Sequence, residues 1–270
     1  MISTKDIGTL GPKGSYSEQA SFEYNKNDGR ILFDSIDEVI NALASDKITE
    51  GILPLENSIQ GTVLETLDGI YYNNLKINKE IIINIEHAIA GVDNSILPGK
   101  VKYIYSHPQA LAQCRAYLKE RYPKAKLIQT PSTSFAVKKV KEDGKKDSLA
   151  IGSKFAIRTY KLSIIEEKIQ DVKNNQTLFV IISKKDNVTS LPFTLLVIDP
   201  KIDRSGLLHD ILSVFKKEKI NLLKIESRPS KKELGKYIFY IKAEISSKDK
   251  RRNLLIKRLK EFGSVALLTK

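Results

Sequence analysis

Short apolar runs alternate with longer segments of helical periodicity through residues 7–183 of this 270-residue chain. Residues 35–43 place their apolar side chains on one helical face, and Ser35 precedes them as a capping residue. Regular alternation of strands and helices is typical of an α/β fold. We predict strands at 7–10, 31–33, 51–55, 79–90, 101–105, 126–129, 149–151 and 177–183. We predict helices from 17, from 35, and at 62–72, 108–121, 132–143 and 153–159.

The pattern changes after a polar segment at residues 183–191. The chain beyond it shows the order strand, helix, strand, strand, helix, strand, which is the ferredoxin-like βαββαβ arrangement. Gly235 lies in the turn between the two middle strands, where a glycine can adopt positive φ. We therefore predict two domains, at residues 1–187 and 192–270. The six elements of the second domain are expected at 193–198, 206–218, 221–228, 236–245, 249–262 and 264–269.

The net charge of +13 raises the question of a nucleic-acid partner. A nucleic-acid interface gathers its basic residues into one stripe or arm with interleaved aromatic residues. Here Lys and Arg are scattered and usually lie near Asp or Glu, as at residues 216–219 and 248–252. We interpret the charge as a solvated, Lys-rich surface and expect no nucleic-acid partner. A positive field would also attract an anionic metabolite, but it identifies none.

Cysteine and histidine usage argues against a disulfide and a metal site. Cys114 is the one cysteine, which excludes an intrachain disulfide and fits a reducing compartment. His87, His107 and His209 are far apart in sequence and form no zinc-binding pair. The longest apolar runs are too short to span a bilayer, and the N-terminus lacks the apolar core of a signal peptide. We expect a cytoplasmic protein without a structural metal or a membrane partner.

Four polar segments each follow a predicted strand directly, at residues 11–17, 54–63, 106–114 and 130–136. Taken singly, each has a structural explanation as an ordinary turn or a helix cap. Cys114 is expected in the core, and His107 on its own is more often structural than catalytic. Gln109 and Gln113 fall on one helical face because they are four residues apart. Since ligands of open α/β folds bind beyond the carboxyl ends of the strands, the four segments together predict a polar cleft.

These segments, in this order, resemble the catalytic domain of prephenate dehydratases. The resemblance lies in Gly-Pro-Lys-Gly-Ser-Tyr-Ser at 11–17, Glu-Asn-Ser at 56–58, Ser-His-Pro-Gln-Ala-Leu-Ala-Gln-Cys at 106–114, the helix start at 132–136 and Asn-Gln-Thr at 175–177. Glu-Ser-Arg-Pro at 226–229 resembles the effector motif of the family's ACT domain. The resemblance covers nearly the whole chain. It implies an α/β, periplasmic-binding-protein-like catalytic domain with two lobes around a cleft, followed by a ferredoxin-like ACT domain.

The resemblance implies that prephenate is dehydrated and decarboxylated to phenylpyruvate without a metal or cofactor. It assigns assistance of the leaving hydroxyl group to Thr177. Substrate positioning is expected from Asn57, Ser106 and Gln113, and Glu56 is expected to orient the site. From the helix-start pattern, backbone N–H groups near Ser15 to Ser17 and near Ser132 and Thr133 are candidates for holding the substrate carboxylates. The substrate-binding set is Ser15, Tyr16, Ser17, Ser132, Thr133 and Asn175.

The ACT resemblance implies that L-phenylalanine binds across a subunit interface and lowers activity. A homodimer or homotetramer is expected to form through this domain. Regulation would then arise because phenylalanine has different affinities for two states. The expected effector-binding residues are Gly206, Leu207, Leu208, Glu226, Ser227, Arg228 and Pro229.

Two positions depart from the family pattern. Leu178 stands where the family usually has arginine, and Leu207 stands where alanine is usual. Because of Leu178, a non-catalytic, amino-acid-sensing protein remains an alternative function, although Thr177, Asn57 and Gln113 are present. Arogenate dehydratase, the same chemistry on an amino-acid analogue of prephenate, also stays open. Leu207 would narrow the effector pocket.

Overall fold

The computed structural model describes residues 6–26, 29–185 and 190–269. The chain forms two compact units, one built from residues 1–66 and 81–180 and the other from residues 67–80 and 181–270. The second unit therefore takes a segment from the middle of the predicted catalytic domain. Residues 186–189 of the predicted linker lie outside the described residues.

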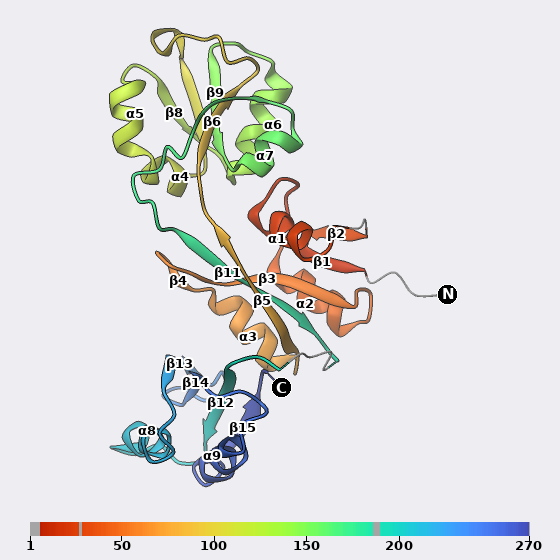
Figure 1. Cartoon of the computed structure of the whole chain (residues 1–270), viewed down its shortest axis with the longest axis vertical. Helices are drawn as coiled ribbons and strands as arrows, with labels where there is room; N and C mark the ends of the chain where they lie inside the picture. Colours follow the sequence, from red (N-terminus) through yellow and green to blue (C-terminus); the bar gives the residue numbers. More distant parts are fainter. Residues whose placement is uncertain (1–5, 27–28, 186–189, 270) are drawn as a thin grey trace. The chain divides into compact units, whose positions relative to one another are not determined.

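One lobe contains a mixed sheet with strand order β2-β1-β3-β11-β5, and the short β4 pairs with β3 (Figure 1). Strands β2, β1 and β3 are parallel to one another, since β1 pairs in parallel with both of its neighbours. Ser35 caps the second helix as predicted, accepting a hydrogen bond from the backbone of Glu38. The elements are β1 (Ile7–Leu10), α1 (Tyr16–Tyr24), β2 (Arg30–Phe33), α2 (Ile36–Ala44), β3 (Glu50–Asn57), β4 (Gly61–Thr62), α3 (Leu64–Tyr72), β5 (Lys76–Asn84) and β11 (Gln176–Ser183).

The other lobe contains a five-stranded sheet of order β10-β6-β9-β7-β8 between two helical layers. Side chains of its central strand alternate between the layers, because Leu149 and Ile151 pack with Leu118 while Ala150 packs with Val137. The strands are β6 (Ala88–Gly91), β7 (Tyr103–Ser106), β8 (Lys126–Gln129), β9 (Ser148–Gly152) and β10 (Ser163–Glu167). The helices are α4 (Pro108–Gln113), α5 (Arg115–Arg121), α6 (Thr133–Asp143), α7 (Lys154–Thr159) and a 3₁₀ turn, η1 (Pro98–Lys100).

The structure divides two elements that the sequence predicts as continuous. Residues 79–90 form parts of β5 and β6, separated at 85–87, where the Ile85 N–H donates to the carbonyl of Asn175. The predicted helix at 108–121 is interrupted at Cys114, whose ψ of 19° ends α4 before α5 begins. Strand β10 was not predicted. The predicted helix at 62–72 begins at Leu64, after the short strand β4.

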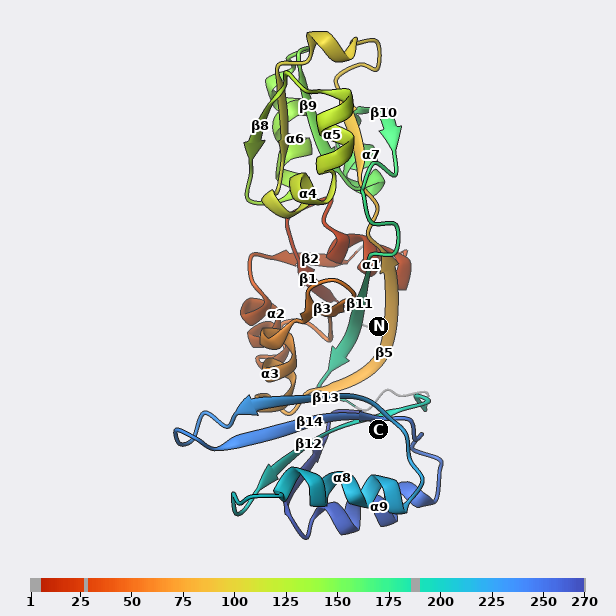
Figure 2. The same cartoon turned by 90° about the vertical axis from the view of Figure 1, so that its left-hand side faces the viewer.

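The second unit contains the predicted βαββαβ order, with an antiparallel sheet arranged β13-β14-β12-β15. Helices α8 and α9 lie on one face of this sheet (Figure 2), and Ile211, Phe215, Leu255 and Leu259 fill the core between them. Gly235 has φ of +86°, as expected for its turn. The elements are β12 (Thr194–Pro200), α8 (Leu207–Lys217), β13 (Leu222–Pro229), β14 (Tyr237–Ala243), α9 (Arg251–Leu259) and β15 (Gly263–Leu267).

The opposite face of the antiparallel sheet packs against the end of α3. Tyr71 meets Tyr240 edge-on, with ring centroids 5.9 Å apart. Ile77 forms a parallel bridge with Thr269, and the Ile77 N–H donates to the carbonyl of Leu268. These contacts explain why residues 67–80 belong to the second unit.

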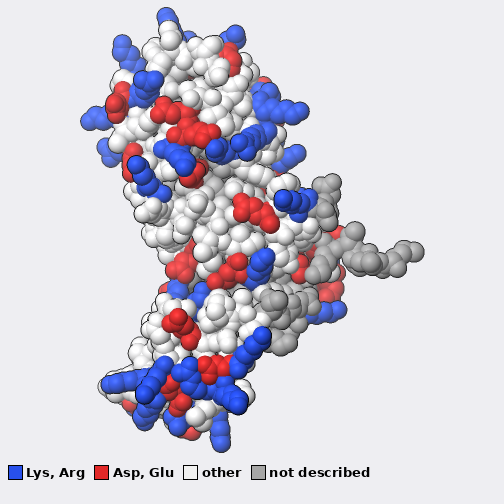
Figure 3. Space-filling model, in the orientation of Figure 1, with Lys and Arg blue, Asp and Glu red and all other residues white. Residues whose placement is uncertain are grey.

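Charges of both signs are interspersed on the surface. Lys and Arg side chains alternate with Asp and Glu over the face seen in Figure 3, without forming one basic stripe there. This distribution agrees with the solvated surface expected from the sequence. Within the described part of the chain, no helix combines the length and apolarity needed to cross a membrane.

Candidate functional site

A cleft of about 350 Å³ lies in the first unit, and all four polar segments predicted from the sequence contribute to it. One side comes from the chain after β1 and β3, and the other comes from the starts of α4 and α6. Nine of the predicted site residues line it: Ser15, Tyr16, Ser17, Asn57, Gln113, Ser132, Thr133, Asn175 and Thr177. Further lining residues include His87, His107, Gln109 and Phe179.

Helices α1, α4 and α6 begin at the cleft, and a serine caps each of α1 and α6. The Ser15 hydroxyl caps α1 by accepting from the Glu18 N–H at 3.0 Å, and the Ser132 hydroxyl caps α6 by accepting from the Phe135 N–H at 3.0 Å. The first turn of a helix has N–H groups without intrahelical acceptors and carries partial positive charge. Gly14, in the loop before α1, has φ of +84°, and a Cβ there would lie 3.1 Å from Cα of Ala156. Glycine therefore permits both the turn and the close approach to α7.

The Asn57 side chain has a fixed orientation. Its Oδ1 accepts hydrogen bonds from the N–H groups of Ile59 and Gln60, both at 3.0 Å. Since backbone N–H groups can only donate, Oδ1 and Nδ2 cannot be exchanged. Nδ2 consequently donates toward Oδ1 of Asn175 at 2.8 Å, Oγ1 of Thr177 at 2.9 Å and the Gln176 carbonyl at 3.1 Å.

This orientation determines what the neighbouring groups can offer to a ligand. Thr177 Oγ1 accepts from Asn57, so the single proton of the Thr177 hydroxyl is available to donate elsewhere. Asn175 Oδ1 also accepts from Asn57, so its Nδ2 hydrogens point away from that contact. Thr177 and Asn175 both line the cleft and are 8% and 4% exposed. Asn57 thus directs two hydrogen-bond donors rather than presenting its own amide group.

Another amide of the cleft belongs to Gln113, whose Oε1 lies 2.8 Å from Nε2 of His87. His87 is buried, and its pKa is lowered because burial disfavours the charged ring, an effect that the Gln113 contact only partly offsets. The Tyr16 hydroxyl donates to the carbonyl of Glu86 at 2.7 Å, and burial raises its pKa well above the usual range. Both side chains are uncharged near neutral pH.

Glu56 and Ser106, which were predicted as site residues, lie outside the cleft lining. Ser106 is fully buried and donates to the carbonyl of Ile151 at 2.8 Å, which links β7 to β9. Glu56 is opposite Thr62 in the β3–β4 pair. Leu178 is also outside the lining, because Thr177 and Phe179 on either side of it face the cleft.

The cleft offers hydrogen-bond donors without formal positive charge. None of the described residues that line it is Lys or Arg. Its donors are amide groups, hydroxyl groups and the helix starts of α1 and α6. No group of three or more His, Cys, Asp or Glu suited to a metal ion occurs in the described part of the chain. Cys114 is buried, and burial raises its pKa to about 12, so it is no activated thiol.

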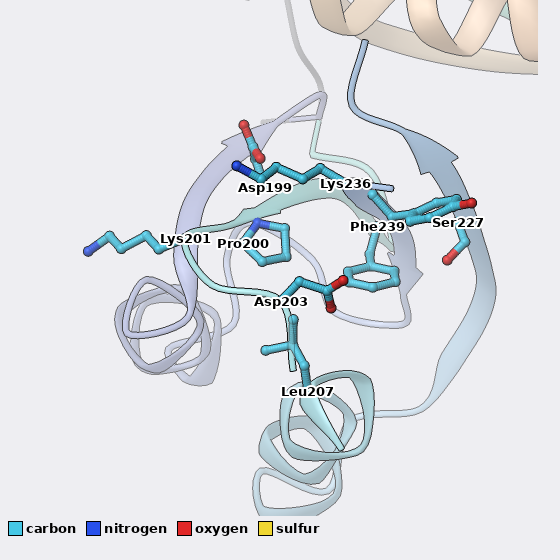
Figure 4. A pocket seen from close by; sticks show the side chains of 9 residues that line it. Asp199, Pro200, Lys201, Asp203, Leu207, Ser227, Lys236 and Phe239 are labelled. Atoms are coloured by element: carbon cyan, nitrogen blue, oxygen red, sulfur yellow. The ribbon is translucent and has the colours of Figure 1, made fainter. Parts of the chain in front are cut away.

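A second cavity, of about 290 Å³, lies in the second unit between the sheet and the start of α8 (Figure 4). Of the seven predicted effector residues, Leu207 and Ser227 line it. Phe239 and Leu207 give it an apolar wall, and Asp203 and Lys236 add charges of both signs. Gly206 precedes α8 with φ of +78° and lies outside the lining, as do Leu208, Glu226, Arg228 and Pro229.

Arg228 instead pairs with Asp68 of α3. Its Nη2 lies 2.9 Å from Oδ2 of Asp68, which also receives Nζ of Lys231 at 2.8 Å, and the Tyr240 hydroxyl donates to Oδ1 at 3.2 Å. The Asp68 side chain is 8% exposed. Arg228 faces α3 because it is opposite Ile238 on β14, whereas Ser227 is opposite Phe239 and faces the cavity.

Substitution of Asp68 by asparagine is expected to lower the free energy of unfolding by about 1.5–3 kcal/mol at pH 7, the range for hydrogen bonds to charged groups. Burial alone would raise the Asp68 pKa, but the hydrogen bonds from Arg228 and Lys231 outweigh it and lower the pKa. This stabilisation is present above the unfolded pKa of about 3.9 and is lost as pH falls through the lower folded pKa.

Urea unfolding at pH 7 and pH 3 measures this effect. The Asp68→Asn variant should approach the wild type at the lower pH, since the wild type has by then begun to lose its charged contact. Lys231→Gln is the comparison, because that side chain is 57% exposed and its removal leaves Arg228 and Tyr240 bonded to Asp68, so a smaller decrease in the free energy of unfolding is expected. Equal losses in both variants at pH 7 would contradict the role of Asp68.

Sequence reasoning did not identify His87 or Asp68. His87 lies within the predicted strand at 79–90 and has no polar neighbour pattern that marks a site. Asp68 is in the interior of a predicted helix, where an acidic residue is normally solvated. Their partners Gln113 and Arg228 are distant in sequence, so no local signal identifies either pair.

Comparison with known proteins relates both units to characterised families. The family described as prephenate dehydratase matches residues 7–187, and the ACT domain family matches residues 196–259. A prephenate dehydratase of Methanocaldococcus jannaschii is 40% identical over 252 residues, which covers 90% of this chain and 89% of the relative.

Two solved structures are similar over nearly the whole chain. Prephenate dehydratase from Arthrobacter aurescens, in complex with L-Phe, has a TM-score of 0.87 at 26% identity and covers 97% of this chain and 88% of that one. Prephenate dehydratase from Staphylococcus aureus has a TM-score of 0.85 at 27% identity, with 98% of both chains covered. The two-lobed fold and the C-terminal ACT fold predicted from the sequence are thereby confirmed.

Proposed function

This chain belongs to the prephenate dehydratase family and carries an ACT domain, and from that premise we propose how its cleft acts. Prephenate has two carboxylates and a ring hydroxyl group. The reaction breaks the carbon–carbon bond to one carboxylate, which leaves as carbon dioxide, and the released electron pair moves into the ring. This electron flow displaces the ring hydroxyl group, so the carbon–oxygen bond breaks, and the departing hydroxide takes up one proton from the solvent to become water. Because the product is aromatic, orientation and stabilisation of the leaving group account for most of the required catalysis.

Thr177 assists the departing hydroxide in this proposal. Its oxygen accepts from Asn57 at 2.9 Å, which directs its proton toward a ligand in the cleft. A threonine hydroxyl is too weak an acid to transfer its proton completely, so it acts by a hydrogen bond that strengthens as negative charge develops on the leaving oxygen. The orientation of Thr177 by Asn57 is the observation on which the proposal mainly rests.

The carboxylates of the substrate are held by neutral donors. Asn175 and Gln113 contribute amide hydrogens, and the first turns of α1 and α6 contribute backbone N–H groups. Helix starts favour anions through both their unpaired N–H groups and their partial charge. Glu56 and Ser106 support the site from the strands behind it, since neither reaches the cleft lining.

The non-catalytic alternative rested on Leu178 in place of the family's arginine. Since Leu178 lies outside the cleft lining, its identity gives no reason to expect loss of substrate contact. Ultraviolet detection of phenylpyruvate from prephenate tests the function, and parallel rates on arogenate test the substrate preference. Formation of phenylpyruvate no faster than the spontaneous reaction, with folded protein, would refute the assignment.

L-Phenylalanine is the proposed effector, and the cavity beside α8 is part of its site. The Arthrobacter aurescens relative was solved in complex with L-Phe. An apolar wall suits a phenyl ring, and the carboxylate and ammonium groups found at Asp203 and Lys236 suit the charges of an amino acid. Leu207 takes volume from this cavity.

Saturating L-phenylalanine is expected to lower the rate of phenylpyruvate formation, because binding favours a less active state. Initial rates at several phenylalanine concentrations measure the effect, with D-phenylalanine as the control for stereospecific binding. Leu207→Ala, which enlarges the cavity, should lower the concentration required for half-maximal inhibition. Rates unaffected by saturating L-phenylalanine would contradict the effector proposal.

A second copy of this chain is the proposed partner of the ACT domain. Edge strand β13 exposes apolar side chains, with Leu223 and Ile225 at 50% and 41%. An exposed apolar edge strand is a natural surface for association. Such pairing would give the homodimer or homotetramer expected from the sequence.

A further inference from the structure

His87 lines the cleft beside Gln113, and hydrogen bonds hold both of its backbone groups. The residue is 3% exposed, its backbone N–H donates to Oε1 of Gln170 at 3.0 Å, and its carbonyl accepts from the Ile169 N–H at 3.0 Å. Nε2 meets Gln113 Oε1 at 2.8 Å. Nδ1 is buried and has no hydrogen-bond partner among the described residues. Buried polar atoms without a hydrogen-bond partner are uncommon in proteins. A buried ring beside the cleft with only one nitrogen hydrogen-bonded therefore requires an explanation.

The contact between His87 and Gln113 allows two arrangements. Either Nε2–H donates to Gln113 Oε1, or the amide is reversed and donates to an unprotonated Nε2. The second arrangement would place the ring proton on Nδ1, where a buried N–H would have no acceptor. Buried unpaired N–H groups are rarer than buried unpaired acceptors, so the Nε2–H arrangement is favoured.

We infer that His87 is a positioning residue: its Nε2–H holds Oε1 of Gln113, so the Gln113 amide hydrogens point into the cleft as donors to a substrate carboxylate. This inference rests on the proposed function for the identity of the ligand, but the orientation itself does not. His87 does for Gln113 what Asn57 does for Asn175 and Thr177. In each case a neighbouring side chain donates to the oxygen of the site residue, and the N–H or O–H group of that residue remains available to the ligand.

The consequence is a set of three oriented side chains in the cleft that can act only as donors toward a ligand. Gln113, Asn175 and Thr177 each have their acceptor oxygen already engaged by a protein group. A ligand rich in acceptors, such as a dianion, therefore meets no competing oxygen from these three residues. This explains how a cleft with neither Lys nor Arg among its described lining residues suits a doubly charged substrate. The neutral state of His87 agrees with this, since burial lowers its pKa.

Two substitutions of His87 separate positioning from packing. His87→Leu keeps a buried apolar side chain but removes the donor, and kcat/KM should fall by about 10-fold or more, mainly through KM, because a hydrogen bond to a charged group is lost. His87→Gln can place an amide N–H near the former Nε2 and should recover kcat/KM to within about threefold of the wild type. His209→Leu, on an 82% exposed histidine, is the matched control for basal activity.

A double-mutant cycle tests whether His87 acts through Gln113. Gln113→Leu should cost as much as His87→Leu, and the double variant should cost no more than either. Additive losses, or a His87→Gln variant no better than His87→Leu at equal thermal stability, would overturn the inference.

Nitrogen-15 NMR of the His87 ring in the wild-type protein gives a result that is independent of activity and of variant folding. A protonated Nε2 with an unprotonated Nδ1 at pH 7 supports the inference, and a protonated Nδ1 overturns it. If the wild type makes no phenylpyruvate, the proposed function fails, while the ring spectrum still decides the orientation of Gln113.

Discussion

Replacement of Thr177 by valine is expected to lower kcat for phenylpyruvate formation by about 10²- to 10³-fold, the range for loss of one hydrogen-bond donor to a developing negative charge. Valine keeps the shape of threonine but has no hydroxyl group, so the departing hydroxide loses its hydrogen bond. Binding of prephenate should change less than kcat, because the contact strengthens only as charge develops on the leaving oxygen.

Thr177→Ser should retain most of the activity, because serine keeps an oxygen within reach of Asn57 Nδ2. Leu178→Arg is the matched control on the adjacent position, which lies outside the cleft lining, and should leave kcat/KM within about twofold of the wild type. Stopped ultraviolet assays and circular dichroism separate catalysis from folding. A valine variant within tenfold of the wild type would show that the leaving group is assisted elsewhere.

Substitution of Asn57 by aspartate is expected to lower kcat/KM by about 10²- to 10³-fold, as for loss of a donor at a site of developing charge. Aspartate still accepts from the N–H groups of Ile59 and Gln60, so the local turn is retained. Its other oxygen, however, replaces Nδ2 and would draw the Thr177 proton toward itself and away from the substrate. The same oxygen would also face Asn175 Oδ1, and two acceptor oxygens cannot form a hydrogen bond with each other.

Steady-state kinetics of Asn57→Asp should therefore resemble those of Thr177→Val, although the hydroxyl group is still present. Asn57→Ser provides a comparison with loss of the amide but without a new charge. Thermal melting monitors the fold, because Asn57 links β3 to Asn175 and to the first residue of β11. Wild-type kcat in the aspartate variant would show that Thr177 is oriented by another group.

Local signals in the sequence were sufficient for much of the fold. The helices predicted from 35 and at 132–143 and 153–159 are present, and in each of them a serine caps its own helix within three residues, which is a local interaction. The break at 85–87 was not predictable in this way, because the Ile85 N–H bonds to Asn175 far along the chain. The apolar run itself continues on both sides of the break.

The location of the site was also predictable from local sequence signals, but the directions of its side chains were not. Polar residues after strands indicated the cleft, since the carboxyl ends of parallel strands meet at one edge. Sequence position did not reveal which way each side chain points. Ser106 ends its strand as expected but donates into the sheet, and Arg228 faces Asp68 because of its register with β14. Both outcomes depend on strands paired across long sequence separations.

The composition of the second unit has a practical consequence for protein engineering. Residues 67–80 pack with the antiparallel sheet through Asp68, Tyr71 and Ile77, so a cut in the polar linker would not release a self-sufficient regulatory module. An isolated fragment from residue 190 onward would expose the face of Tyr240 and leave Arg228 without its carboxylate. Chimaeras that exchange regulation between relatives should therefore replace two segments from the same donor protein, residues 67–80 and residues 181–270.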